Sequence, residues 1–183
     1  MKEYLISLAK FSEGDSSCLI AESCLGYLSQ FTTPGSLNNE NMNNFQLAGY
    51  AARYWVDHAR DAEQSDKKSK VIEELTEELF NINGAIFVTW IQLWDPESWL
   101  QWTDFARRPT ASPLYYASMR GLYYHVQRLI EKGQNVNAQG GKHGNALQAA
   151  SLYGNQEIVK MLMDKGADVN AQGGGYSNAL HAA

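Results

Sequence analysis

A period of 33 residues in the C-terminal part of the chain limits its fold more than any other feature. Three similar stretches begin 33 residues apart, at 112 (SPLYYAS), 145 (NALQAAS) and 178 (NALHAA). Other landmarks keep the same offset: Gly121 and Gly154, Gly133 and Gly166, and the Val-Asn-Ala-Gln stretches at 136–139 and 169–172. Agreement of several landmarks in one register indicates that one small structural unit is stacked repeatedly.

The residues within each period predict two short antiparallel helices. Ser112 is a good N-cap and Pro113 fits the first helical position, while Asn145 and Asn178 are caps for the later units. The first glycine of each period suits a left-handed exit from the first helix, and the second glycine ends the second helix. Alanines on the first helices allow close packing, so the stack should curve around that side.

This pattern resembles the ankyrin repeat, which has the same period and opens its first helix with a Thr-Pro-Leu-His-like motif. The resemblance covers residues 110–183: two full repeats, 110–142 and 143–175, and a partial third, 176–183. The sequence departs from the family in having Asn-Ala for Thr-Pro in the second and third repeats. It also has Gly140 or Gly173 where the loop between repeats usually carries Asp, so we expect flexible loops that order on contact with a partner.

The ankyrin resemblance implies a non-catalytic module that binds another protein. In this family, partners mostly contact the loops between repeats and the ends of the first helices. By register, the candidate contact residues in this chain are Met119, Arg120, Gln139, Lys142, His143, Leu152, Tyr153, Gln172 and Tyr176. The chain stops at Ala183 within the third repeat, so we expect a fragment or truncated gene model that frays from about Gly173 onward.

Residues 1–108 predict further helices, so we expect an all-α protein with a helical connector or capping region before a short, truncated solenoid at 109–183. Apolar spacing predicts three helices, from about residue 15 to 30, at 45–63 and at 68–80, with a polar, mobile loop at 32–44. Their expected apolar sides are, in order, Cys18, Ala21, Leu25 and Leu28; Ala48, Ala52, Trp55 and Ala59; and Val71, Ile72, Leu75 and Leu79. Residues 84–94 are apolar on nearly every side and should be buried. A solenoid needs its first unit covered, and we hypothesise that four tryptophans do so: Trp90, Trp94, Trp99 and Trp102.

This first half resembles the helical connector that joins the NACHT nucleotide-binding module to ankyrin repeats in fungal receptor-like proteins. The residues that carry this resemblance are 2–5 (KEYL), 21–28 (AESCLGYL) and 47–60 (LAGYAARYWVDHAR). The resemblance implies an alternative function, as the C-terminal part of a nucleotide-dependent signalling switch. The chain itself contains no G-x-x-x-x-G-K-[ST] motif, so the nucleotide module would lie upstream.

Charge and composition argue against several other functions. The net charge of −5 disfavours nucleic acid as a partner, and the longest apolar run, residues 85–94, is about half of a membrane span. Cys18 and Cys24 lie too far apart along one predicted helix for a disulfide, so we expect buried thiols. Two unpaired thiols favour a reducing compartment, the cytoplasm, with the nucleus left open.

The sequence contains no recognisable catalytic arrangement. His58, His125, His143 and His181 do not have metal-ligand spacing, and His125 is expected to be partly buried between helices. The glutamates at 73, 74, 77 and 78 spread around one helix and predict a solvated face. We therefore expect no enzymatic activity, no cofactor, no metal and no small-molecule substrate.

Overall fold

The protein is all-helical in a computed structural model that describes residues 13–65, 69–81, 84–98 and 111–175. The first half forms α2 (Glu13–Leu28), the short 3-10 helix η1 (Met42–Asn44), α3 (Ala48–Gln64), α4 (Lys70–Leu79) and α5 (Ala85–Leu93). The repeats form α6 (Pro113–Met119), α7 (Tyr123–Glu131), α8 (Ala146–Leu152) and α9 (Gln156–Asp164). Within these ranges the β-structure consists of one isolated bridge between Gln139 and Asn145. The predicted boundary at 108/109 falls outside the described residues.

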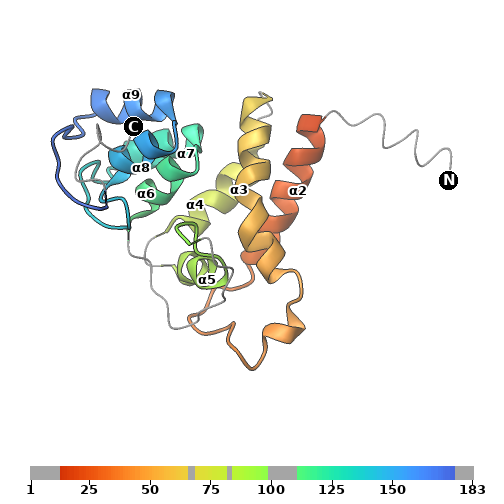
Figure 1. Cartoon of the computed structure of the whole chain (residues 1–183). Helices are drawn as coiled ribbons and strands as arrows, with labels where there is room; N and C mark the ends of the chain where they lie inside the picture. Colours follow the sequence, from red (N-terminus) through yellow and green to blue (C-terminus); the bar gives the residue numbers. More distant parts are fainter. Residues whose placement is uncertain (1–12, 66–68, 82–83, 99–110, 176–183) are drawn as a thin grey trace.

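Helices α2 and α3 lie side by side and bury the faces that their apolar spacing predicts (Figure 1). Ala21, Leu25 and Leu28 of α2 are buried, although Cys18 is only half-buried. The four predicted core residues of α3 are all buried: Ala48, Ala52, Trp55 and Ala59. The connection between the two helices places Leu37 in the core, so part of the predicted polar loop is anchored there.

Helix α4 buries Ile72 and Leu79 and partly buries Leu75, as its apolar spacing predicts, but it does not bury Val71. Ser69 caps it by accepting a hydrogen bond from the Ile72 amide at 3.2 Å. Val71, expected to be buried, is 48% exposed, whereas Thr76 is fully buried and its hydroxyl donates to the Ile72 carbonyl. Positions 72, 76 and 79 share one helical face, and Val71 lies about 100° away from Ile72 around the helix axis. A hydroxyl satisfied within its own helix can occupy a core position that a count of apolar residues overlooks.

Helix α5 is buried on nearly all sides, as predicted, and it completes an aromatic core. The Trp90 ring packs edge-on against Trp55 at 5.5 Å and Phe80 at 6.0 Å between ring centroids. Its indole N–H donates to the Ala52 carbonyl at 2.9 Å. Edge-to-face packing of large rings with a satisfied indole N–H is a strongly stabilising arrangement for a small core.

The repeats have the local structure that the 33-residue period predicts. The side chain of Ser112 accepts a hydrogen bond from the Tyr115 amide, and the Asn145 side chain accepts one from the Gln148 amide. The glycines after the first and second helices all have positive φ, between 69° and 86°. Helices α6 and α8 pack together as inner neighbours, and α7 packs against α9.

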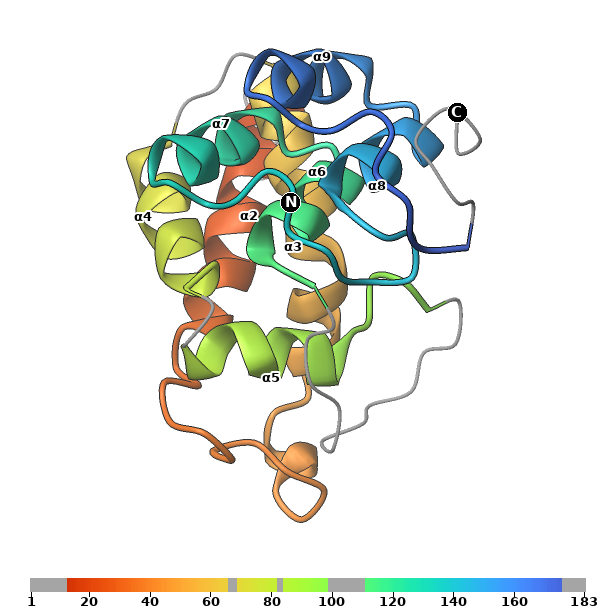
Figure 2. The same cartoon turned by 90° about the vertical axis from the view of Figure 1, so that its left-hand side faces the viewer.

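The helical half covers one end of the repeats, with α4 beside α7 and α5 beside α6 (Figure 2). Phe87 and Trp90 both pack edge-on against Tyr116 of the first repeat, at 6.0 and 5.9 Å between ring centroids. Trp90 therefore contacts the repeats as the capping hypothesis requires. Trp94 lies instead over the guanidinium of Arg53, and Trp99 and Trp102 lie outside the described residues.

Candidate protein-interaction surface

The predicted contact residues differ widely in their exposure. Gln139, Lys142, Tyr153 and Gln172 are exposed, and Arg120 and Leu152 are partly buried. Met119 is only 1% exposed and His143 only 5%, so these two side chains are not available to a partner in this structure. Tyr176 lies outside the described residues. The exposed members lie on the loops between repeats and at the end of α8, which together we call the inner surface.

His143 is buried because its ring lies between two tyrosines. It stacks nearly parallel to Tyr115, with 18° between the ring planes, and meets Tyr153 edge-on at 5.8 Å between centroids. Burial lowers the pKa of His143 below its ordinary value, which favours the neutral ring. The sequence register placed His143 at a loop tip but did not reveal the aromatic neighbours that cover it.

The first loop between repeats is held by a buried carboxylate from the helical half. The Tyr115 hydroxyl donates to Oε1 of Glu97 at 2.5 Å and accepts from the His143 amide at 3.1 Å. The same Glu97 oxygen accepts from the Lys142 amide at 2.5 Å. Burial and the Glu97 carboxylate raise the pKa of Tyr115 far above its ordinary value, so the hydroxyl remains a donor. The expected flexibility of this loop is therefore opposed by specific hydrogen bonds.

The second loop is supported in a simpler way. Gln148 takes the register position of Tyr115, and its side-chain amide donates to the carbonyls of Ala171 and Gly173 at 3.2 Å each. The Gly175 amide donates to the Lys142 carbonyl at 3.0 Å, which joins this loop to the preceding one. The chain was expected to fray from about Gly173 onward. For residues 173–175, these hydrogen bonds argue against that prediction. Residues 176–183 lie outside the described ranges.

Arg120 connects the repeats to the helical half. Its guanidinium forms an ion pair with Asp57 of α3 at 2.8 Å, and Asp57 also pairs with Arg60 at 3.3 Å. Arg60 in turn donates to the Arg120 carbonyl at 3.4 Å. Asp57 is thus shared between two arginines at the place where α3 meets the end of α6.

A pocket of about 290 Å³ opens beside this ion pair, and we call it the junction pocket. Its walls come from α3 (Arg53, Tyr54 and Asp57), from the segment after α5 (Trp94 and Glu97) and from the ends of α6 and α8 (Arg120 and Tyr153). The Arg53 guanidinium carbon lies 5.0 Å from the ring centroid of Tyr54 and 4.8 Å from that of Trp94. Sequence reasoning missed Arg53 and Glu97, because the pocket gathers residues from segments that have no common spacing.

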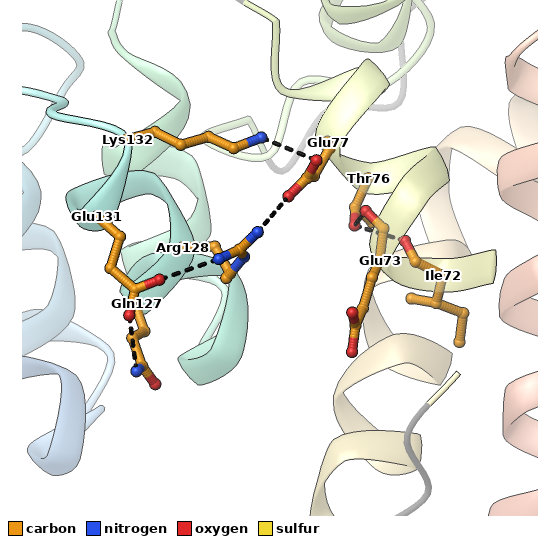
Figure 3. Close-up of polar contacts among 8 residues, drawn as sticks. All are labelled: Ile72, Glu73, Thr76, Glu77, Gln127, Arg128, Glu131 and Lys132. Atoms are coloured by element: carbon orange, nitrogen blue, oxygen red, sulfur yellow. Dashed lines mark hydrogen bonds and ion pairs between the residues drawn. The ribbon is translucent and has the colours of Figure 1, made fainter. Parts of the chain in front are cut away.

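A second set of polar contacts joins the outer helices α4 and α7 (Figure 3). Glu77 pairs with Lys132 at 2.9 Å and with Arg128 at 3.1 Å, and Arg128 also pairs with Glu131. These cations lower the pKa of Glu77, through the Lys132 hydrogen bond first. The glutamate face of α4 was expected to be solvated, but its residue Glu77 is paired with cations of the repeats.

His125 of α7 also connects the repeats to the helical half. It is buried, and its Nδ1 lies 2.7 Å from a Glu63 carboxylate oxygen. The expectation that His125 is partly buried between helices is thus confirmed, with Glu63 of α3 as a partner that the sequence did not suggest. Across the described residues, no group of three or more His, Cys, Asp and Glu is arranged to hold a metal ion.

Comparison with known proteins identifies the repeats. The family model for ankyrin repeats, in three copies, matches residues 95–173, which bears out the ankyrin resemblance. A Monascus ruber protein described as azaphilone pigments biosynthesis cluster protein L is 40% identical to this chain over 151 residues. That match covers 75% of this chain and 31% of the relative, so the chain spans about a third of that protein's length. Neither match bears on the resemblance to NACHT-associated connectors. No described helix is both long and apolar enough to cross a bilayer.

Proposed function

We propose that this chain is a non-catalytic protein-interaction module that binds a segment of another protein on its inner surface. The observation that carries the proposal is the exposure of Tyr153 (43%) among polar loop residues of an ankyrin array. Tyrosine is a frequent contact hot spot because its large rigid ring loses little entropy on binding. Cys24 is a buried free thiol, which supports the further proposal of a reducing, cytoplasmic setting.

A matched pair of tyrosines provides the test. Tyr153 on the inner surface and Tyr123 on α7 are both 43% exposed, so replacing either by alanine removes a comparable ring. Random peptides displayed on phage are selected on the full chain, and the enriched sequences are synthesised for affinity measurements by fluorescence anisotropy. Tyr153→Ala should weaken binding by about tenfold or more, the scale of a hot-spot residue. Tyr123→Ala should leave the affinity within about twofold.

Two results would count against this function. If no peptide is enriched over a surface without protein, the array is not a general peptide-binding module. If the selected peptides lose as much affinity for Tyr123→Ala as for Tyr153→Ala, binding takes place elsewhere or depends only on overall stability. Thermal unfolding of both variants separates these cases, since a change in stability shifts the midpoint and a change in a contact alone does not.

A second candidate function is a relay between these repeats and an upstream nucleotide-binding module. The observation that favours it is the set of polar contacts between the two halves, which includes the ion pair of Arg120 with Asp57. Such contacts can take two discrete arrangements and so can transmit a conformational change. The coding sequence upstream of Met1 tests this candidate: a P-loop motif in frame with the chain supports it, and a stop codon close upstream rejects it.

A further inference from the structure

We propose that the junction pocket binds an acidic side chain of the partner protein, with Arg53 as the group that recognises its carboxylate. The inference rests on the proposed function, because the pocket borders the inner surface through Tyr153. It goes further by naming the chemistry of one partner residue and the place where that residue binds.

The first argument is charge. Arg120 and Asp57 of the pocket wall neutralise each other at 2.8 Å, and Arg60 adds a second cation to Asp57. Glu97 is occupied by the Tyr115 hydroxyl and the Lys142 amide. Among the described residues Arg53 has no carboxylate partner, even though Asp57 lies one helical turn away on α3. Arg53 therefore brings to the pocket a guanidinium that no carboxylate of the described residues pairs with.

The second argument is orientation. The Arg53 guanidinium lies over the rings of Tyr54 and Trp94, and the side chain is half-buried. Ring contacts use the flat faces of a guanidinium and leave the N–H groups in its plane available. A carboxylate pairs with that edge through two parallel hydrogen bonds, and a group already held by two rings loses little freedom when it does so.

The third argument is that the size of the pocket and the carboxylates in its wall favour one kind of anion over others. A volume of about 290 Å³ lies at the lower limit for small-molecule sites, so it suits a side chain better than a nucleotide. Asp57 and Glu97 stand in the same wall, and a doubly charged phosphate would be repelled by both more strongly than a singly charged carboxylate. One unpaired guanidinium matches one carboxylate.

The experiment is a double-mutant cycle on the full chain with peptides from the selection described above. Each enriched peptide that contains Asp or Glu is compared with its Asn or Gln analogue. With the wild-type chain the acid-to-amide change should lower affinity by about tenfold or more. With Arg53→Gln the two peptides should bind equally, because the group that distinguishes them is gone.

Matched variants separate recognition from general charge and stability. Arg128→Gln removes an exposed arginine from α7 and should preserve the tenfold difference between acid and amide peptides. Arg53→Lys keeps the charge without the planar edge and should retain only part of it. If acid and amide peptides bind the wild-type chain equally while binding still depends on Tyr153, the carboxylate pocket is rejected and the proposed function stands.

If no peptide is selected, a direct titration still decides the pocket. The Nε–Hε resonance of Arg53 is followed by NMR as N-acetylglutamate N-methylamide, its glutamine analogue or inorganic phosphate is added. A saturable shift with the glutamate compound, absent with glutamine and weaker with phosphate, supports the proposal. No shift with the glutamate compound overturns it, and an equal or stronger shift with phosphate overturns the assignment of a carboxylate.

Discussion

The repeats and the helical half are built from helices of similar kind, but only in the repeats does a fixed 33-residue period determine which units are neighbours. Asn137 donates to the Gly166 carbonyl at 3.0 Å, and Asn155 donates to the Ser118 carbonyl at 2.8 Å. Both bonds join one unit to the next. In the helical half, the packing of Trp90 on Trp55 and Phe80 follows no constant spacing. A periodic sequence thus reveals which units meet, whereas a single-copy helix reveals only which of its faces is apolar.

This difference predicts that the stability of the helical half depends on a few large buried side chains, and above all on Trp90. Trp90→Ala should destabilise the protein by about 3–5 kcal/mol, because it opens a cavity among Trp55, Phe80 and Tyr116. Urea unfolding followed by far-UV circular dichroism measures the change. The exposed Val71 serves as the control, and Val71→Ala should shift stability by less than about 0.5 kcal/mol.

Because Trp90 also touches the first repeat, its loss should weaken both halves together. Native-state amide exchange is expected to show faster exchange in α6 as well as in α3 and α5. Unchanged protection of α6 in the Trp90→Ala protein would mean that the repeats fold without help from the helical half, and the capping hypothesis would then be wrong.

The next prediction asks whether the loops between repeats are flexible or fixed. Gly141 and Gly133 have similar positive φ values of 76° and 82°, but a Cβ on Gly141 would collide with the Tyr115 ring. A Cβ on Gly133 meets nothing within 4 Å. Gly133→Ala should therefore cost about 1–2 kcal/mol from backbone strain alone.

Gly141→Ala should cost about 1–3 kcal/mol more than Gly133→Ala, because the collision adds overpacking to the same strain. Thermal unfolding of the two variants gives the comparison. Equal destabilisation would show that the first loop moves away from Tyr115 at little cost, as its glycine content suggested.

A third prediction compares a contact between the two repeats with a contact between the first repeat and the helical half. Asn155 donates from the second repeat to the carbonyls of Ser118 and Met119, at 2.8 and 3.1 Å. At the same end of α6, Arg60 of α3 donates to the next carbonyl, that of Arg120, at 3.4 Å. Asn155→Ala should cost about 1–2 kcal/mol because it removes the donor of two partly buried hydrogen bonds.

Arg60→Met keeps the aliphatic stem but removes this longer, partly exposed bond and the partly exposed ion pair of Arg60 with Asp57. Both are weak, so it should cost less, at about 0.5 kcal/mol. Urea unfolding of both variants measures the ratio. A larger effect for Arg60→Met would show that the helical half holds the first repeat more tightly than the second repeat does.

How much of the structure could be predicted from the sequence also differs between the repeats and the helical half. The caps at Ser112 and Asn145 and the turns at the four glycines are local, so residue type and offset were sufficient to predict them. The stripe on α3 was predicted in full, while α4 was predicted incorrectly at Val71 because Thr76 takes the core position. The family resemblance indicated where a binding surface should lie but not which of its residues are exposed.

The junction pocket was beyond sequence reasoning for a physical reason. Arg53, Glu97 and Arg120 come together only because α3, the segment after α5 and the end of α6 pack around one another. No local pattern states that Tyr115 bonds Glu97, or that His143 is covered by Tyr115 and Tyr153. Non-local contacts without a period require the tertiary packing to be known first.

The smallest expected effect is at the outer contact between α4 and α7, and it tests whether the exposed charges of Glu77, Arg128 and Lys132 help to join the two halves. Glu77→Gln removes the pairs with Lys132 and Arg128, and since the Glu77 side chain is 38% exposed, the loss should be only about 0.2–1 kcal/mol at neutral pH and low salt. High salt should reduce it further. Glu78→Gln on the same helix is the control, because Glu78 forms no ion pair within the described residues.

The pH dependence of this contact has a definite sign. The cations lower the pKa of folded Glu77 below its unfolded value, so its contribution is fully present above the unfolded pKa of about 4.5 and is lost as pH falls through the folded value. The stability difference between the wild type and Glu77→Gln should therefore be constant from pH 7 to about 5 and should shrink in more acidic solution. A difference that persists below the folded pKa would show that Glu77 acts through packing, and that its ion pairs with Lys132 and Arg128 do not hold the two halves together.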